Sequence, residues 1–184
     1  MTKILFVNAC VRECSRTLEL ANHVLSKLDG IVDEVRLYER ALFPIDQQKL
    51  QMRDQAKRDG DFSDSEFELA KQFANADTIV IAAPYWDLMF PSLLKIYFEN
   101  ITVNGITFVY SEKGIPQGLC KANRLIYVTT SGGPVVHNLG YEYTLSLAKA
   151  FYGITRVECV SAEGLDIQGA DVEEILKKAK NTFN

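Results

Sequence analysis

The chain has 184 residues, of which 47% are hydrophobic and 24% charged, a balance typical of one soluble globular domain and not of a disordered, collagenous or coiled-coil chain. The formal net charge of −4 gives no reason to expect a nucleic-acid partner or binding to an anionic membrane. We find no apolar run near the roughly 20 residues of a spanning helix and no signal peptide. We therefore expect a single cytosolic domain over residues 1–184.

Strands and helices alternate in the first half of the chain. The apolar run Ile4–Val7 predicts a buried strand over Lys3–Ala9, and a strand is also predicted over Val32–Tyr38. Between them, helical spacing of apolar residues predicts a helix that ends before Gly30. The polar segment 41–62 is the hardest to interpret, with one helix expected near Gln47–Arg58. The apolar stripe of the first helix comprises Leu18, Ala21, Val24, Leu25 and Leu28.

The second half continues the alternation. Ser63 and Glu66 have the spacing of a capping box, which predicts a helix start there. Strands are predicted over Thr78–Ala83 and Arg124–Thr130, with an edge strand around Val157 and Cys159. Three further helices are expected. One has Pro91 in its first turn, one is lined by Tyr143, Leu147 and Phe151 and stops at Gly153, and one is capped by Asp171.

This alternation is typical of an α/β protein with a parallel sheet and helices on both faces. Ligands of such sheets bind at the carboxyl ends of the strands. The segments that follow the strands are therefore the candidate binding residues.

The segment after the first strand resembles a phosphate site. It runs from Asn8 to Thr17 and opens a helix, so it combines amide groups at a helix start with two hydroxyls and the arginines Arg12 and Arg16. In the alternative interpretation, Ser15 or Thr17 is only an N-cap and the arginines are solvated. No GxGxxG or Walker motif occurs here.

The same segment leaves a cysteine phosphatase open as an alternative. Cys10 and Arg16 have C-x5-R spacing, as in low-molecular-weight tyrosine phosphatases. The loop between them lacks Gly and Asn for tight turns, Glu13 would repel phosphate, and the chain has no Asp-Pro dipeptide. Among the four cysteines no CxxC pair occurs, so no metal site is expected.

Two further segments are suited to a flat ring system. Pro84–Pro91 is an aromatic and apolar loop after a core strand, and Thr129–Pro134 contains two glycines that permit close approach of a ligand. A loop folded on its own core and a plain turn are the respective alternatives. One phosphate site and two ring-contacting loops at one sheet edge indicate a mononucleotide with a planar head, which is FMN.

The sequence resembles the flavodoxin-like family of FMN-dependent NADH-azoreductases and NAD(P)H:quinone oxidoreductases. The resemblance extends from the first strand to about Leu165. The segments that carry it are Ala83–Asp87, Pro91, Leu94-Lys95, Tyr97-Phe98, Gly105–Tyr110, Gly114, Gly118-Leu119, Lys121, Thr129–Gly133, Phe151–Ile154 and Ala162–Gly164.

This resemblance implies a three-layer doubly wound fold with five parallel strands in the order 2-1-3-4-5. It implies FMN as cofactor, NADH or NADPH as hydride donor, and a quinone or azo compound as acceptor, with the chemistry carried by the flavin and no catalytic side chain. The implied cofactor-binding residues are Asn8, Ser15, Arg16, Thr17, Pro84, Tyr85, Trp86, Asp87, Leu88, Thr130, Ser131, Gly132 and Gly133. Asn8-Ala9 and Asp87 depart from the family, which usually has Ser and Asn at these places.

The resemblance also implies a homodimer with the flavin near the subunit interface. The apolar side chains of Trp86, Leu88, Met89 and Phe90, together with the helix after Pro91, favour such pairing because one small domain cannot easily bury them all. A non-catalytic flavin carrier of the flavodoxin type is the alternative function. A carrier is expected to be strongly acidic around the flavin, whereas this chain is only mildly acidic.

Overall fold

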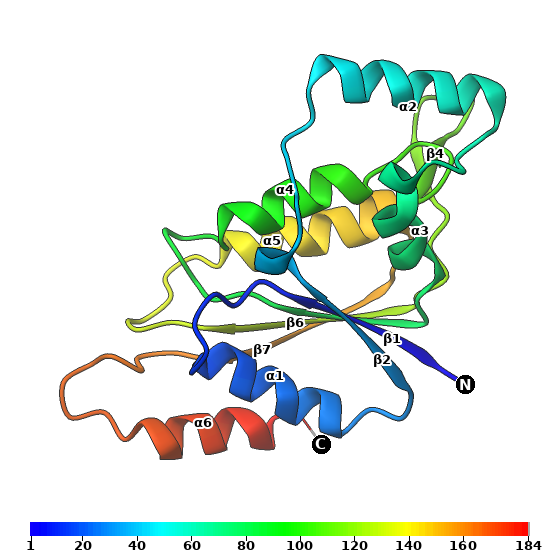
Figure 1. Cartoon of the computed structure of the whole chain (residues 1–184). Helices are drawn as coiled ribbons and strands as arrows, with labels where there is room; N and C mark the ends of the chain where they lie inside the picture. Colours follow the sequence, from blue (N-terminus) through cyan, green and yellow to red (C-terminus); the bar gives the residue numbers. More distant parts are fainter. Residues whose placement is uncertain (184) are drawn as a thin grey trace.

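Five parallel strands form the central sheet in the order β2-β1-β3-β6-β7 (Figure 1). Counted along the chain within this sheet, that order is the predicted 2-1-3-4-5, and the predicted fold class is confirmed. The structure is a computed structural model, and it describes residues 1–183. The strands of the sheet are β1 (Lys3–Asn8), β2 (Ile31–Arg36), β3 (Thr78–Ala82), β6 (Arg124–Thr130) and β7 (Arg156–Ala162).

Helices cover both faces of the sheet and enclose two hydrophobic cores (Figure 1). One face is covered by α1 (Arg16–Ser26) and α6 (Val172–Asn181), and Asp171 caps α6 as predicted. The other face is covered by α3 (Glu68–Asn75), α4 (Ser92–Ile101) and α5 (Leu139–Leu147). Strands β1, β3 and β6 are buried on both faces. Their sequences are therefore apolar runs and do not alternate between apolar and polar residues.

The polar helix α2 (Gln47–Asp59) lies apart from the sheet, beyond α4 (Figure 1). Only Ala56 of α2 is buried, so apolar packing does little to hold it. The Arg53 guanidinium instead donates hydrogen bonds to the carbonyls of Glu99 and Asn100 at the end of α4, at 3.0 and 2.9 Å. This arrangement satisfies carbonyls that a helix end leaves without partners. The predicted helix near Gln47–Arg58 is thereby confirmed.

One local prediction was wrong. Ser63 does not cap a helix: the Asp64 carboxylate accepts from the Glu66 amide, and the 3-10 turn η2 (Ser65–Phe67) precedes α3. Tyr143, Leu147 and Phe151 line α5 and the π-helical turn η3 (Ala148–Tyr152) as predicted, and they pack partly buried against the core before the helix stops at Gly153. The fully buried residues of this segment are Gly140, Thr144, Ala148 and Tyr152. At Gly140, α5 lies so close to the sheet that a Cβ would be 2.8 Å from the Tyr127 hydroxyl, so a small residue is needed at that position.

Two further differences concern short elements. The predicted strand Val32–Tyr38 ends at Arg36, because Leu37–Glu39 form the 3-10 turn η1. The antiparallel pair β4 (Phe108–Tyr110) and β5 (Pro116–Gly118) was not predicted, since three-residue strands carry almost no periodic signal. Within the described range, no helix combines the length and apolar character needed to cross a membrane.

Candidate functional site

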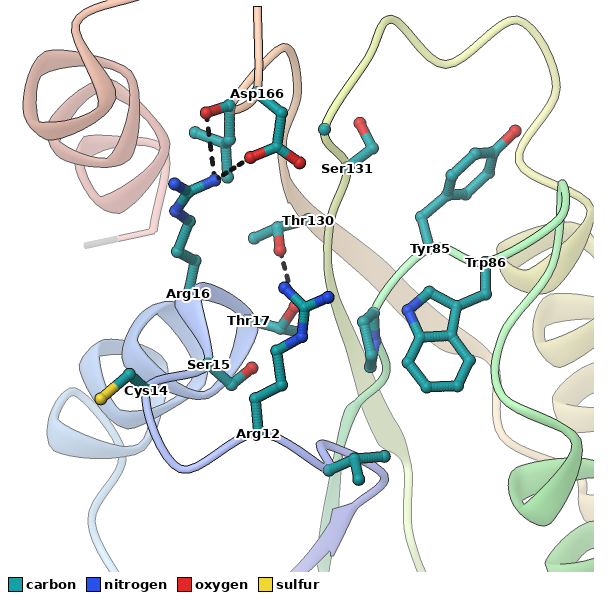
Figure 2. A pocket seen from close by; sticks show the side chains of 14 residues that line it. Arg12, Cys14, Ser15, Arg16, Thr17, Tyr85, Trp86, Thr130, Ser131 and Asp166 are labelled. Carbon is teal, nitrogen blue, oxygen red and sulfur yellow. Dashed lines mark hydrogen bonds and ion pairs between the residues drawn. The ribbon is translucent and has the colours of Figure 1, made fainter.

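A cavity of about 310 Å³ opens where β1, β3 and β6 end, at the carboxyl edge of the sheet (Figure 2). Its walls come from the loop after β1 and the start of α1, the loop after β3, the end of β6, and the loop after β7. The lining residues are Val11, Arg12, Cys14, Ser15, Arg16, Thr17, Pro84, Tyr85, Trp86, Thr130, Ser131, Gly132, Leu165 and Asp166. The tertiary structure therefore brings most of the predicted site residues into one cavity.

The start of α1 forms the polar end of the cavity. Ser15 is the N-cap of α1, and its hydroxyl accepts a hydrogen bond from the Leu18 amide at 3.3 Å. The amides of Arg16 and Thr17, the first two residues of the helix, have no partner within the helix, so they are available to an anion. Thr17 is 1% exposed, and its hydroxyl shares a hydrogen bond of 2.6 Å with the Thr130 hydroxyl. These groups make a donor-rich floor between α1 and β6.

The two arginines of this end are in different situations. Arg16 Nη1 lies 2.7 Å from Asp166 Oδ1 and donates to the Leu165 carbonyl at 3.0 Å. Arg12 points into the cavity (Figure 2). Leu165 and Asp166 were not among the predicted site residues, and Arg12 was predicted only as part of the phosphate segment, not among the residues implied by the family resemblance. Both Leu165 and Asp166 belong to the loop after β7 and so lie at the same carboxyl edge, a position from which the strand-end rule could have identified them.

The loop after β3 forms the apolar end. The Tyr85 amide donates to the Thr130 carbonyl at 3.0 Å, and the Tyr85 hydroxyl donates to the His137 carbonyl at 3.0 Å. Trp86 and Met89 exchange backbone hydrogen bonds of 3.0 and 2.8 Å, which closes a tight two-residue turn. Pro84, Tyr85 and Trp86 thus present a fixed, largely apolar wall to the cavity.

Asp87 and Leu88 lie at the tip of that turn and do not line the cavity. Both have left-handed backbone angles, with φ of 51° and 69°, as the two central residues of such a turn require. Residues without a glycine's freedom are strained there, and such strain is found mainly at functional sites. The Asp87 carboxylate is therefore held outside the cavity, on the exposed surface.

The loop after β6 forms the roof. Gly132 lines the cavity, and a Cβ at this position would lie 2.3 Å from Asp166 Oδ2, so a larger residue would push that carboxylate out of its present position. Ser131 donates from its hydroxyl to the Gly133 carbonyl at 2.6 Å. Gly133 itself is outside the lining.

Asn8 is also outside the lining. It is buried, donates to the Glu34 carboxylate at 2.9 Å and accepts from the Cys10 amide at 2.9 Å. These contacts stabilise the turn that leaves β1.

The geometry gives no support to a cysteine nucleophile. Burial raises the pKa of the Cys10 thiol above its ordinary value, so this thiol stays protonated at neutral pH. Cys10 does not line the cavity, and its sulfur faces the Ala82 carbonyl at 3.9 Å. A phosphatase would need a thiolate inside the phosphate loop. Across residues 1–183, no cluster of three His, Cys, Asp or Glu side chains is suited to hold a metal ion.

Comparison with known proteins gives a consistent result. The family described as having a flavodoxin-like fold matches residues 2–184. The FMN-dependent NADH:quinone oxidoreductase of Lachnoclostridium phytofermentans is 33% identical, over 98% of this chain and 95% of the relative. The FMN-dependent NADH:quinone oxidoreductase 2 of Clostridium acetobutylicum is 32% identical, over 96% of this chain and 94% of the relative.

Solved structures agree with these relatives. An azoreductase from Bacillus anthracis superposes with a TM-score of 0.84 at 25% identity, covering 99% of this chain and 96% of that one. An FMN-dependent NADH-azoreductase from the same species, solved in complex with FMN, gives a TM-score of 0.81 at 25% identity, covering 100% of this chain and 96% of that one.

Proposed function

This chain belongs to the flavodoxin-like family that includes the FMN-dependent NADH:quinone oxidoreductases, and we propose that its FMN binds in the cavity at the ends of β1, β3 and β6. The protein is an FMN-dependent oxidoreductase that transfers hydride from NADH to quinones or azo compounds. The observation that carries the proposed site is the division of one cavity into a donor-rich end and an aromatic end.

The chemistry of the donor set fits FMN. Hydroxyls, first-turn amides of α1 and a guanidinium at one end suit a phosphate. Pro84, Tyr85 and Trp86 at the other end suit a flat heterocycle, and Gly132 permits close approach of its polar edge. The Tyr85 amide donates a hydrogen bond to the Thr130 carbonyl at the end of β6, which joins the aromatic end of the cavity to the polar end. The sheet therefore fixes the distance between the two ends.

The chain's own contribution to the reaction is to bind and to position. FMN supplies the hydride chemistry when it is bound, and no side-chain acid or nucleophile is required of the protein. Ser15 and Thr17 hold the phosphate end, and the Tyr85–Trp86 wall orients the ring. The hydrogen bond from the Tyr85 hydroxyl to the His137 carbonyl ties the aromatic loop to the loop that follows β6, which limits movement of that wall. NADPH as an alternative donor remains a prediction.

Steady-state kinetics test this function. We propose that NADH and the acceptor react in turn at the same flavin, so NADH should leave before the acceptor binds. With NADH and a quinone both varied, double-reciprocal plots should be parallel lines. The purified protein should also be yellow and should bind FMN more tightly than riboflavin. Bound flavin without turnover of any nicotinamide would instead indicate the non-catalytic carrier.

We also propose that the active unit is a homodimer. Trp86 and Leu88 remain 42% and 49% exposed on the aromatic loop, and Val136, on the loop tied to it through His137, is 79% exposed. Adjoining exposed apolar loops favour contact with a second copy, most simply about a two-fold axis. Phe90, in contrast, is only 5% exposed and packs against Phe98 with ring centroids 5.7 Å apart, so it does not need a partner.

Sedimentation at micromolar concentration should give a particle of twice the chain mass. Leu88→Glu should shift it toward the monomer, because the charge would lie in the contact. Ile31→Glu, on the exposed edge strand β2, is the matched control and should leave the dimer intact. A wild-type monomer that holds FMN and turns over fully would contradict the dimer.

The cytosolic location is the last part of the proposal. All four cysteines are unpaired thiols, as Cys10, Cys14, Cys120 and Cys159 form no disulfide in the described chain. Free thiols in this number suit a reducing compartment.

A further inference from the structure

We infer that Arg12, and not Arg16, is the side chain whose positive charge binds the FMN phosphate. The inference rests on the proposed function, which places FMN in this cavity, and it decides between the two arginines that the sequence places in the phosphate segment; the family resemblance had implied Arg16. The reason is that, of the three charged side chains that line the cavity, Arg16 and Asp166 form an ion pair and Arg12 does not.

The Arg16 guanidinium is already paired with other groups of the protein. Its Nη1 is 2.7 Å from Asp166 Oδ1 and also donates to the Leu165 carbonyl at 3.0 Å. The backbone of Asp166 is fixed, because its amide donates to the Gly132 carbonyl at 2.9 Å, and Gly132 has no Cβ that would crowd the carboxylate. The Arg16–Asp166 pair therefore joins α1 to the loop after β7, and its two charges cancel.

Arg12 carries the charge that remains. The charged side chains that line the cavity are Arg12, Arg16 and Asp166, so the net charge of the lining equals that of Arg12 alone. For the part of the chain that the structure describes, no carboxylate lies within ion-pair distance of the Arg12 guanidinium, and it makes no hydrogen bond. Figure 2 shows this side chain directed into the cavity, beside Ser15 and Thr17.

A phosphate is the ligand that this arrangement suits. A guanidinium presents a planar fork of donors that matches two phosphate oxygens, and such charge-assisted contacts are stronger than neutral ones. Arg12 adds this fork to the hydroxyls of Ser15 and Thr17 and to the first-turn amides of α1, which would approach the same group from the helix side. The phosphate could belong to FMN or to the pyrophosphate of NADH; the shared floor with Ser15 and Thr17 favours FMN.

The test compares FMN with riboflavin, which lacks the phosphate. Flavin-free protein is titrated with each flavin, and the dissociation constants are measured from fluorescence quenching. Arg12→Gln should weaken FMN binding roughly ten- to a hundredfold, as expected for loss of one contact between charged groups, and should leave riboflavin within about twofold. Arg58→Gln, an exposed arginine on α2 that is hydrogen-bonded to Gln55, removes the same charge elsewhere and should change neither constant.

Two double variants separate the arginines. Arg16→Gln with Asp166→Asn removes the neutral pair as a unit and should leave the ratio of FMN to riboflavin affinity within about threefold of wild type. Arg12→Gln with Asp166→Asn frees Arg16 and restores the net charge of the lining, so it should recover at least tenfold of the FMN affinity lost in Arg12→Gln. Riboflavin binding reports in every variant that the cavity is still formed.

Three results would overturn the inference. The ratio of FMN to riboflavin affinity could stay unchanged in Arg12→Gln, it could collapse in the Arg16–Asp166 double variant, or Arg12→Gln could raise only the KM for NADH, which would assign Arg12 to the dinucleotide. Failure of the proposed function has a different signature, because wild-type protein would then bind neither flavin or would bind both equally well.

Discussion

Thr17→Glu is expected to weaken FMN binding by at least tenfold and by up to about a thousandfold. Thr17 is 1% exposed and lies on the cavity floor, so the new carboxylate would face the FMN phosphate with little water between them. Two like charges about 4 Å apart near a protein surface repel by about 4 kcal/mol. Each 1.4 kcal/mol corresponds to a factor of ten in affinity. Titration of the flavin-free variant with FMN measures the loss.

Thr17→Val is the matched control, since it keeps the volume and removes only the hydroxyl. It loses the hydrogen bond of 2.6 Å to Thr130 and should cost about 1 kcal/mol of stability, with FMN affinity within tenfold of wild type. Thr17→Glu should weaken riboflavin binding less than FMN binding, because riboflavin has no phosphate for the new carboxylate to repel. If Thr17→Glu has a native circular dichroism spectrum and an unchanged ratio of FMN to riboflavin affinity, the phosphate lies elsewhere.

Gly118→Ala is expected to destabilise the folded state by about 3 kcal/mol, the upper part of the usual range for overpacking. A Cβ on Gly118 would lie 2.1 Å from the backbone nitrogen of Gly153 and 2.1 Å from the carbonyl carbon of Tyr152. Both contacts are with backbone, so no side chain can rotate away, and β5 would have to move off η3. The midpoint of urea unfolding, with an unchanged slope, measures this loss.

Gly133→Ala provides the comparison for Gly118→Ala. A Cβ on Gly133 would meet no atom within 4 Å, and the residue has no left-handed backbone angle that an alanine would strain. Its unfolding midpoint should therefore stay near wild type, within about 0.5 kcal/mol. Equal midpoints for the two variants would mean that β5 can separate from η3 at little cost.

Sequence patterns predicted the sheet well because each core strand is a short, continuous apolar run. Ile4–Val7 and Ile79–Ile81 are buried on both faces, and the alternation of such runs with amphipathic helices leaves few possible topologies. The exact start of α3 could not be predicted in the same way. Ser63 and Asp64 are both good cap residues, but Asp64 caps only the 3-10 turn η2, and α3 begins after Phe67 without a side-chain cap.

The buried stripe of α5 illustrates a second limit. Tyr143, Leu147 and Phe151 have perfect helical spacing, and so do Thr144, Ala148 and Tyr152. The second set is the buried one and lies on the same side of the helix as Gly140, where the missing Cβ lets α5 approach Tyr127 closely. Hydrophobicity alone favours the larger side chains and cannot show how near a helix will pack.

For the candidate site, the sequence by itself determined which loops take part. Segments after β1, β3 and β6 must meet at one edge, because parallel strands all end there. Which side chains of those loops are available to a ligand was decided by tertiary structure. Arg16 and Asp166 are separated by 150 residues and neutralise one another, and Asp87 is turned outward by a tight turn. Charge pairing between distant residues has no local signal, since it depends on distances that exist only after the strands have come together.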